Sequence, residues 1–303
     1  MPQPVQTAAA AAPATEQVRQ GPVWDYLELT KPNVVWLILM STLVGYYIAA
    51  PGQLSLIAMF HVVFATGLMA AGTGALNQWW EQRTDRLMQR TENRPLPSGR
   101  LSSAGALSFG LALAAAGLAY AAVAVNMLSF WVGLATVVSY VLVYTPLKTR
   151  SPLATFVGAF PGAAPLLLGW TAARNTLSLE GWVLFSILFL WQFPHFYAIA
   201  WMYREDYGRA GIKMLPVVDP EGGSTGRQII AYAFNLIPVS VAPWMLGMAG
   251  PVYGVAAVIL GSVYLYYGVR LARIKTHAAA RKLLLASVVY LPLLYLFLVA
   301  DKV

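Results

Sequence analysis

The chain has 303 residues, of which 58% are hydrophobic and 11% are charged, and its net charge is +8. A soluble domain carries about 25% charged residues, so this composition argues against a soluble protein and predicts one membrane-embedded, all-α bundle. The absence of cysteine excludes disulfides, thiolate metal sites and cysteine nucleophiles. The positive charge suits loops facing the cytoplasm and an anionic lipid bilayer, so no nucleic-acid partner is expected.

The first segment, residues 1–22, is rich in alanine, proline and glutamine. It lacks the basic start and the central apolar run of a secretory signal peptide. Its composition predicts a disordered N-terminal tail. One transmembrane domain is then predicted over residues 23–303.

Nine apolar segments follow, each near the length of about 20 residues that a helix needs to cross the bilayer core. Several contain glycine or proline, which neighbouring helices accommodate in membrane proteins. The predicted spans are 33–50, 56–80, 102–122, 127–145, 153–172, 180–201, 228–248, 252–271 and 282–300. The sequence therefore predicts nine transmembrane helices in one bundle around a central cavity.

Lysine and arginine divide unevenly between the two sets of connections that nine spans create. One set, which includes the N-terminal segment, carries 18 of the 20 basic residues, and the other carries only Arg174 and Lys302. The positive-inside rule places the first set in the cytoplasm, with the N-terminus inside and the C-terminus outside. The long, acid-containing loops lie on this side, so the cavity is expected to open there.

The end of the second span carries Asn77, Glu81 and Asp85, which are spaced four residues apart. On a helix this spacing aligns them on one face, about 6 Å apart in height. Two carboxylates without a partner repel each other, whereas clustered oxygen ligands suit Mg²⁺, which often bridges carboxylates and substrate phosphates. These three residues are therefore predicted to be catalytic metal ligands.

Arginines follow the first acidic motif within one loop, among them Arg90 and Arg94. Guanidinium groups bind phosphate oxygens through paired hydrogen bonds, so this mouth is predicted to hold a Mg²⁺-bound diphosphate. Alternatively, these are ordinary loop charges that pair with each other and obey the positive-inside rule. That alternative accounts for the arginines but not for the acids that share one helical face with Asn77.

A second acidic site follows the sixth span, where Glu205 and Asp206 stand beside Arg204, Arg209 and Lys213. These acids are expected to hold Mg²⁺ on the same membrane face, and the cations to contact phosphate. The alternative is an ordinary amphipathic loop. A lipid-soluble substrate with a diphosphate head fits this layout, with its tail among helices whose aromatic side chains stabilise an allylic cation.

Four segments resemble the UbiA-type intramembrane prenyltransferases and, within that family, the branch that acts on haem. They are "LTKPNVV" (29–35), "GTGALNQWWEQRTDRLMQRTENRPLPSGR" (72–100), "YTPLKTRSPLATFVGAFPGAAPLLLGW" (144–170) and "WQFPHFYAIAWMYREDYGRAGIKMLPVV" (191–218). The strings "MQRTENRPLP" and "DYGRAGIKMLPVV" resemble the haem branch rather than the quinone prenyltransferases.

The resemblance implies that farnesyl diphosphate loses diphosphate and that its farnesyl group joins a vinyl group of haem B, giving haem O for terminal oxidase assembly. It implies an enzyme of the bacterial cytoplasmic (inner) membrane, with haem A synthase or a terminal oxidase as a neighbouring partner. The residues that it places against the diphosphate are Arg90, Arg94 and Lys148, and Lys213 of the second loop is expected to bind the diphosphate with them.

The resemblance also maps a Mg²⁺ site onto Asn77, Glu81 and Asp85, where glutamate at position 81 departs from the family's more usual aspartate. The second motif is incomplete, because many relatives have Asp-x-x-x-Asp whereas Asp206 is followed four residues later by Ala210. A metal role for Asp206, with or without Glu205, therefore stays open.

Two of the three histidines lie inside predicted spans and are candidates for haem binding. His195 lies in the sixth span, and His61 lies in the second span, away from the expected mouth. An imidazole at either place could ligate the haem iron. Alternatively, it could hydrogen-bond a neighbouring helix or steer a proton.

Two other functions are also compatible with the sequence. A prenyltransferase for a quinone precursor or another aromatic acceptor would use the same chemistry. A transporter for an anionic metabolite belongs to another class, but transporter sites usually lie near the bilayer midplane, whereas these polar groups cluster at one face.

Overall fold

The computed structural model describes residues 21–303, and this part of the chain is helical. The prediction of an all-α fold is confirmed. The helices are α1 (Pro22–Leu29), α2 (Pro32–Ala49), α3 (Leu56–Asp85), α4 (Ser103–Tyr120), α5 (Met127–Val138), α6 (Thr145–Leu147), α7 (Ala154–Arg174), α8 (Leu179–Met202), α9 (Arg204–Arg209), α10 (Leu215–Val218), α11 (Gly223–Met245), α12 (Pro251–Ile274) and α13 (His277–Ala300). Most of the predicted tail, residues 1–22, lies outside the described residues, and Pro22 already begins α1.

Nine helices in the described part of the chain are long and apolar enough to cross a membrane. They coincide with the nine predicted spans. Two of these spans continue through π-helical turns, η1 (Ala121–Val125) after α4 and η2 (Ser139–Tyr144) between α5 and α6. The prediction of nine spans is therefore confirmed.

Three helix boundaries lie five residues beyond the predicted spans, and polar side chains cap two of these extended ends. α3 continues through Asp85 instead of ending near residue 80. α13 begins five residues earlier than predicted, because the Thr276 hydroxyl accepts a hydrogen bond from the Ala279 backbone N–H. α11 also begins five residues early, where Asp219 accepts hydrogen bonds from the backbone and the hydroxyl of Thr225.

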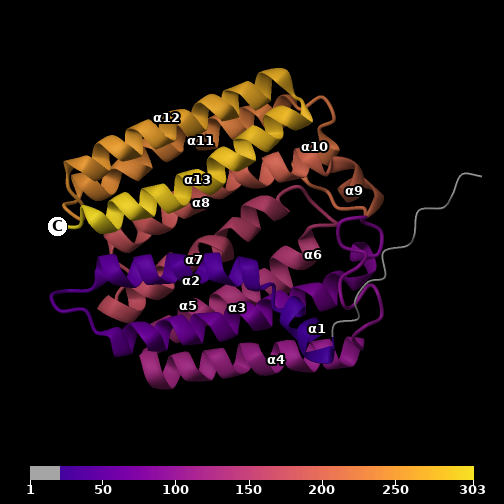
Figure 1. The fold of residues 1–303 in the computed structure, drawn as a ribbon, viewed down its shortest axis with the longest axis horizontal. Coiled ribbons are helices and arrows are strands. Elements are labelled where there is room, and N and C mark those ends of the chain that lie inside the picture. Colours follow the sequence, from indigo (N-terminus) through magenta and orange to yellow (C-terminus); the bar gives the residue numbers. More distant parts are fainter. Residues whose placement is uncertain (1–20) are drawn as a thin grey trace, which may run out of the picture.

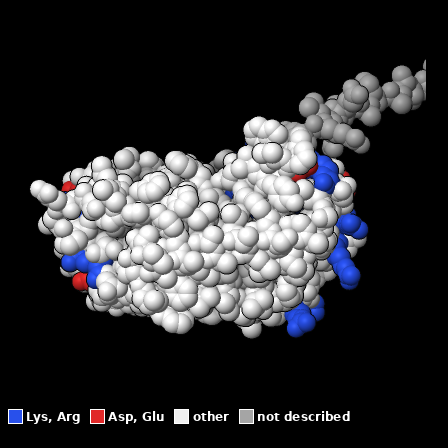
Figure 2. All heavy atoms as spheres, turned by 90° about the horizontal axis from the view of Figure 1, so that it is seen from below, with Lys and Arg blue, Asp and Glu red and all other residues white. Residues whose placement is uncertain are grey.

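The two ends of the bundle differ in what they carry. α1, α6, α9 and α10 lie at one end, here called the α1 end, and the last residue lies at the opposite, C-terminal end (Figure 1). Charged side chains gather at both ends, and the broad band between them is almost uncharged (Figure 2). Such a band suits the hydrocarbon core of a bilayer. The cytoplasmic orientation of the α1 end remains a prediction.

The helices form two adjoining groups. α2, α3, α4, α5 and α7 make one group, and α8, α11, α12 and α13 make the other (Figure 1). α7 packs against α8, and a hydrogen bond of 3.2 Å between Ser41 of α2 and Tyr295 of α13 joins the groups at a second place. The largest cluster of buried apolar residues lies across α7, α8 and α11 to α13.

α2 and α7 approach closely because glycines remove side chains from their interface. A Cβ at Gly45 would overlap the carbonyl oxygen of Leu166, and a Cβ at Gly169 would overlap that of Thr42. Small residues of this kind allow helix backbones to approach in membranes. The contact holds α2 in place, and the residue before α2 belongs to the site described below.

The two basic residues that lie apart from the others are at the C-terminal end. Arg174 Nε donates to the Ala49 carbonyl at 2.5 Å, and Lys302 Nζ donates to the carbonyls of Tyr47 and Ala50 at 2.7 and 3.1 Å. Both cations therefore satisfy carbonyls left unpaired at the end of α2. They also line a cavity of about 700 Å³ that lies at the opposite end from the predicted catalytic residues.

Replacing Gly169 with alanine is expected to destabilise the protein by about 1–3 kcal/mol, because one methyl group must push two backbones apart. Gly67→Ala is the matched control, since its new Cβ would lie 3.7 Å from the nearest atom, Leu39 Cδ2, an ordinary contact. Thermal unfolding of the purified protein in detergent measures both changes. Equal midpoints for the two variants would contradict this account of the α2–α7 contact.

Candidate functional site

α3 presents Asn77, Glu81 and Asp85 on one face because the helix runs unbroken to Asp85. Asn77 and Asp85 are almost fully buried, with exposed fractions of 0% and 1%. The Glu81 side chain is 12% exposed. Polar groups buried this deeply require partners, so the surrounding segments must supply them.

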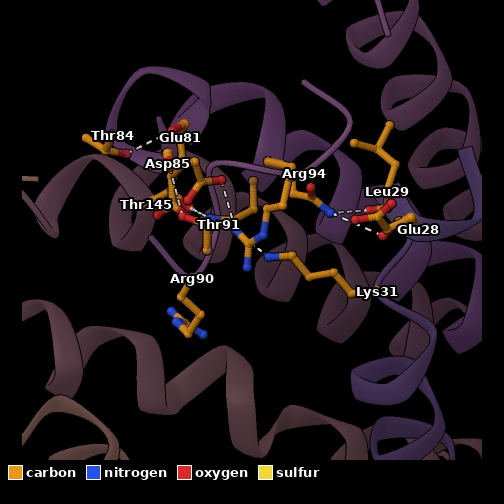
Figure 3. Close-up of polar contacts among 12 residues, drawn as sticks. Glu28, Leu29, Lys31, Glu81, Thr84, Asp85, Arg90, Thr91, Arg94 and Thr145 are labelled. Carbon is orange, nitrogen blue, oxygen red and sulfur yellow. Dashed lines mark hydrogen bonds and ion pairs between the residues drawn. The ribbon is translucent and has the colours of Figure 1, made fainter. Parts of the chain in front are cut away.

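Each of these three side chains is held by a cation from a different segment. Lys31 Nζ lies 2.6 Å from Asn77 Oδ1, and Lys148 Nζ lies 2.6 Å from Glu81 Oε1. Arg94 Nη1 lies 2.8 Å from Asp85 Oδ2. We call these six residues the polar cluster. In Figure 3, the side chains of Lys31 and Arg94 extend toward the carboxylates of α3, and Arg90 is set apart.

Lys31 reaches Asn77 because the chain bends sharply between α1 and α2. It adopts a left-handed conformation, with φ of 56°, directly before Pro32. The Gln78 side chain of α3 donates hydrogen bonds to the carbonyls of Glu28 and Leu29 at 3.3 and 3.0 Å. The α3 side chain therefore pairs with backbone carbonyls that are free at the C-terminal end of α1, and it fixes the turn that carries Lys31.

Lys148 follows α6 and is tied to two other parts of the α1 end. Its ammonium lies 4.6 Å from the centre of the Tyr144 ring, a cation–π contact. Its backbone carbonyl accepts a hydrogen bond of 2.8 Å from the N–H of Lys213. The connection after η2 and the loop after α9 therefore meet beside Glu81.

The two lysines of the polar cluster respond differently to burial. Burial and the nearby positive charge of Arg94 lower the pKa of Lys31 to about 7. Burial also acts to lower the pKa of Lys148, but the Glu81 carboxylate outweighs it and raises that pKa well above its usual value. The Lys148–Glu81 pair therefore stays ionised. Lys31, whose pKa is lowered, is the lysine of the site that loses its proton more easily.

The donor atoms of α3 fit a hard divalent cation. Asn77, Glu81 and Asp85 offer only oxygen ligands, as Mg²⁺ prefers. Asp85 Oδ1 is buried and has no hydrogen-bond partner among the described residues, so it is available to a ligand. Residues 21–303 contain no group of three or more His, Asp or Glu side chains placed to share a metal, so further ligands would come from phosphate or water.

The second acidic motif lies at the same end of the bundle but makes separate contacts. Glu205 and Asp206 begin α9, and Asp206 forms an ion pair with Arg209. The structure therefore does not join Glu205 and Asp206 to Glu81 and Asp85 in one metal-binding cluster. Whether they bind a metal remains a prediction.

The two loops of the α1 end nevertheless touch. Arg90 lies over the rings of Tyr203 and Tyr207, at 5.3 and 5.9 Å from their centres. A small hydrophobic cluster joins Met88 of the first loop to Ala210 and Ile212 of the second. The loops after α3 and α8 therefore form one continuous surface beside the polar cluster.

The structure separates the two candidate histidines. His61 bonds the Tyr120 hydroxyl at 2.8 Å and lies 20 residues before Glu81 on α3, which is about 30 Å along the helix. His195 lies seven residues before the end of α8, about 10 Å from the α1 end. Only His195 therefore lies in the same half of the bundle as the polar cluster.

Comparison with known proteins identifies the family. Residues 38–294 match the model of the UbiA prenyltransferase family. The chain belongs to this family. Two curated relatives, from Solibacter usitatus and Koribacter versatilis, are 52% and 44% identical over 92% of this chain and 98% and 93% of their own lengths. Both are called protoheme IX farnesyltransferase.

Solved structures agree with the fold of this UbiA prenyltransferase. A digeranylgeranylglyceryl phosphate synthase structure superposes with a TM-score of 0.78 at 18% identity, covering 92% of this chain and 98% of that chain. A UbiA homologue from Archaeoglobus fulgidus, bound to GPP and Mg²⁺, gives 0.66 at 20% identity, covering 91% and 99%. The predicted resemblance to the family is confirmed, and the chain is a multi-pass membrane protein.

Lys31 and Thr145 belong to the site of this UbiA prenyltransferase but were not predicted from the sequence. Thr145 Oγ1 accepts from Asn77 Nδ2 at 3.1 Å and donates to the Tyr140 carbonyl, which fixes the orientation of the amide. Lys31 stands in the string "LTKPNVV" that supports the family resemblance. A lone basic residue directly before a proline and an apolar span was the available signal.

Replacing Lys148 with methionine is expected to cost about 3 kcal/mol of stability, because it leaves the Glu81 charge buried without its partner. The double variant Glu81→Gln/Lys148→Met removes both charges and is expected to recover most of that loss. Thermal unfolding of these two variants and of Glu81→Gln alone gives the interaction free energy between Glu81 and Lys148. Additive effects would show that the ion pair contributes little.

Proposed function

We propose that this UbiA prenyltransferase transfers the farnesyl group of farnesyl diphosphate to a vinyl group of haem B. The observation that carries the proposal is the polar cluster at the α1 end, in a chain whose relatives are called protoheme IX farnesyltransferase. Family membership supports prenyl transfer, and the polar cluster supports binding of a diphosphate. The names of the relatives support haem as the acceptor.

The charges of the polar cluster suit a diphosphate. Glu81 and Asp85 carry two negative charges, and Lys31, Arg94 and Lys148 carry three positive charges when Lys31 is protonated. A diphosphate ester brings an excess of negative charge that this net positive, water-poor site would attract. On its arrival, the three cations would contact phosphate oxygens and release the oxygens of α3.

Asn77, Glu81 and Asp85 would then hold Mg²⁺. When bound, the ion neutralises charge that builds on the departing diphosphate. Arg90 from the loop after α3, and Lys213, Glu205 and Asp206 from the loop after α8, would complete the diphosphate site. Their support is the contact between the two loops.

The proposed reaction replaces the bond between farnesyl and diphosphate with a bond to the vinyl group. The bond between C1 of farnesyl and the diphosphate oxygen breaks, and its electron pair leaves with the diphosphate. The allylic cation takes the electron pair of the vinyl double bond and forms a new carbon–carbon bond. Water adds to the resulting cation and loses a proton. Aromatic faces such as those of Tyr140 and Tyr144, 5.0 Å apart beside Lys148, would stabilise the allylic cation.

The membrane setting agrees with this chemistry. The bias of 18 in 20 basic residues supports a cytoplasmic position for the α1 end, in the inner membrane of a bacterium. Both proposed substrates partition into or near the bilayer. The haem O formed would pass to haem A synthase or to a terminal oxidase, which we propose as neighbouring partners.

Two alternatives have weaker support. Prenylation of a quinone precursor would use the same polar cluster, but the names of the relatives favour haem. Transport of an anionic metabolite would place polar groups along a path through the membrane. Here Lys31, Arg94 and Lys148 converge on one end of α3.

The acceptor is tested by incubating the purified protein in detergent with farnesyl diphosphate, Mg²⁺ and haem B, or with 4-hydroxybenzoate as the competing acceptor. Mass spectrometry is expected to find haem whose mass has increased by one farnesyl group and one hydroxyl group. Prenylated benzoate without prenylated haem would overturn the proposed acceptor. No product from either acceptor would contradict prenyl transfer.

Asp85→Asn tests the proposed metal and diphosphate site. It removes a charge but keeps the shape, and it is expected to lower kcat by about 100-fold or more. Asp219→Asn is the matched control, because Asp219 caps α11 through an oxygen that asparagine also provides. Near wild-type turnover of Asp85→Asn would refute the assignment, and a cooperative thermal unfolding transition in both variants would show that they are folded.

A further inference from the structure

The hydrogen bonds of His195 fix which of its nitrogens carries a proton. His195 Nδ1 lies 2.7 Å from Ser287 Oγ, and the same hydroxyl donates to the Leu284 carbonyl at 2.6 Å. A serine hydroxyl has one hydrogen, which the Leu284 carbonyl takes. Ser287 must therefore accept from Nδ1–H, so the neutral ring has an unprotonated Nε2.

Nε2 of His195 has no hydrogen-bond partner among the described residues. His195 is only partly buried. A histidine that only joins two helices would be satisfied by the contact with Ser287. The lone pair on Nε2 is left available for another group.

Aromatic side chains hold the imidazole ring in one orientation. Trp191 stacks on it, with ring centres 4.7 Å apart and planes inclined by 23°. The Trp191 indole donates to the Ser287 carbonyl at 3.0 Å, and the Tyr264 hydroxyl donates to the Trp191 carbonyl at 3.0 Å. Three helices, α8, α12 and α13, therefore fix both the ring and its tautomer.

His195 lies about as far from the α1 end as Asn77 does, so an acceptor bound at His195 would lie at the depth of the proposed diphosphate site. It is seven residues from the end of α8, and Asn77 is eight residues from the end of α3. At about 1.5 Å per residue, both lie about 10–12 Å from the α1 end. His61 lies far deeper, and His277 is exposed at the start of α13.

Basic side chains lie closer to the membrane surface on the helix that holds Ser287. Arg281 and Lys282 are exposed on α13, six and five residues before Ser287, which is about 8–9 Å along the helix. Haem carries its carboxylates on one edge, several ångströms from the iron. A haem whose iron lies at His195 could therefore direct these carboxylates toward the basic end of α13.

We infer that Nε2 of His195 binds the iron of the haem acceptor and that Ser287 is a positioning residue which holds the ring in the binding tautomer. Histidine ligands of metals usually donate their other N–H to a neighbouring acceptor in this way, and a histidine is a common axial ligand of haem iron. The inference rests on the proposed haem acceptor. It adds the atom that orients the haem before its vinyl group reacts.

Titration of the purified protein in detergent with haem B tests the inference through the Soret band and the electron paramagnetic resonance spectrum. The wild type is expected to show a histidine-ligated spectrum. His195→Ala is expected to lose it and to regain it when imidazole is added. Ser287→Ala is expected to keep a histidine-ligated spectrum and to bind haem about 10-fold more weakly. His277→Ala, a change at an exposed position, is the matched control.

A wild-type spectrum in His195→Ala would overturn the inference, as would loss of the histidine signature in His61→Ala instead. If His195→Ala does not fold, His195→Met provides the test, because its thioether would change the spectrum without emptying the position. The assay for farnesylated haem separates this inference from the proposed function. If the wild-type protein farnesylates haem and the spectrum of His195→Ala equals that of the wild type, the iron ligand is refuted and the proposed function stands.

Discussion

The pairing of buried charge at the end of α3 is the interaction on which the architecture of the α1 end depends. A carboxylate buried in a low-dielectric region is strongly destabilising unless a cation lies beside it. Asp85 and Glu81 meet this requirement through Arg94 and Lys148, which come from connections far apart in the sequence. The loop after α3 and the connection after η2 must therefore converge on one helix face, and the turn before α2 joins them there through Lys31.

This pairing also prepares the site for its proposed chemistry. A site that is already charged and ordered needs little reorganisation when charge develops on a leaving group. The carboxylates are held in place by cations that a diphosphate can share, and Asp85 Oδ1 is left without a partner among the described residues. The arrangement that stabilises the folded chain thus leaves oxygens of α3 available to a metal and cations available to phosphate.

The apolar part of the bundle keeps this site rigid, and the C-terminal end uses charge differently. Gly45 and Gly169 let α2 and α7 approach closely, which fixes the helix that follows Lys31. At the C-terminal end, Arg174 and Lys302 bind backbone carbonyls of α2 instead of carboxylates. Cations at that end complete a helix terminus, whereas those at the α1 end hold acidic side chains that can bind a ligand.

The sequence by itself determined the nine spans, because apolar runs of about 20 residues have few other stable environments. It also determined that Asn77, Glu81 and Asp85 share one face, because helical spacing is a local property. α1 was not predicted, since its eight residues are too few to cross a bilayer and its position depends on contacts with α3. Only the tertiary structure could show that Lys31 completes the site.

The second acidic motif and His195 show the same limit. Sequence reasoning placed Glu205 and Asp206 at the correct end of the bundle, but Asp206 pairs with Arg209 and the two acids do not join the α3 oxygens in one cluster. The tautomer of His195 depends on Ser287, 92 residues away. Helical periodicity fixes which residues of one segment lie together, whereas side-chain partners from distant segments depend on how the helices pack, and only the tertiary structure decides that.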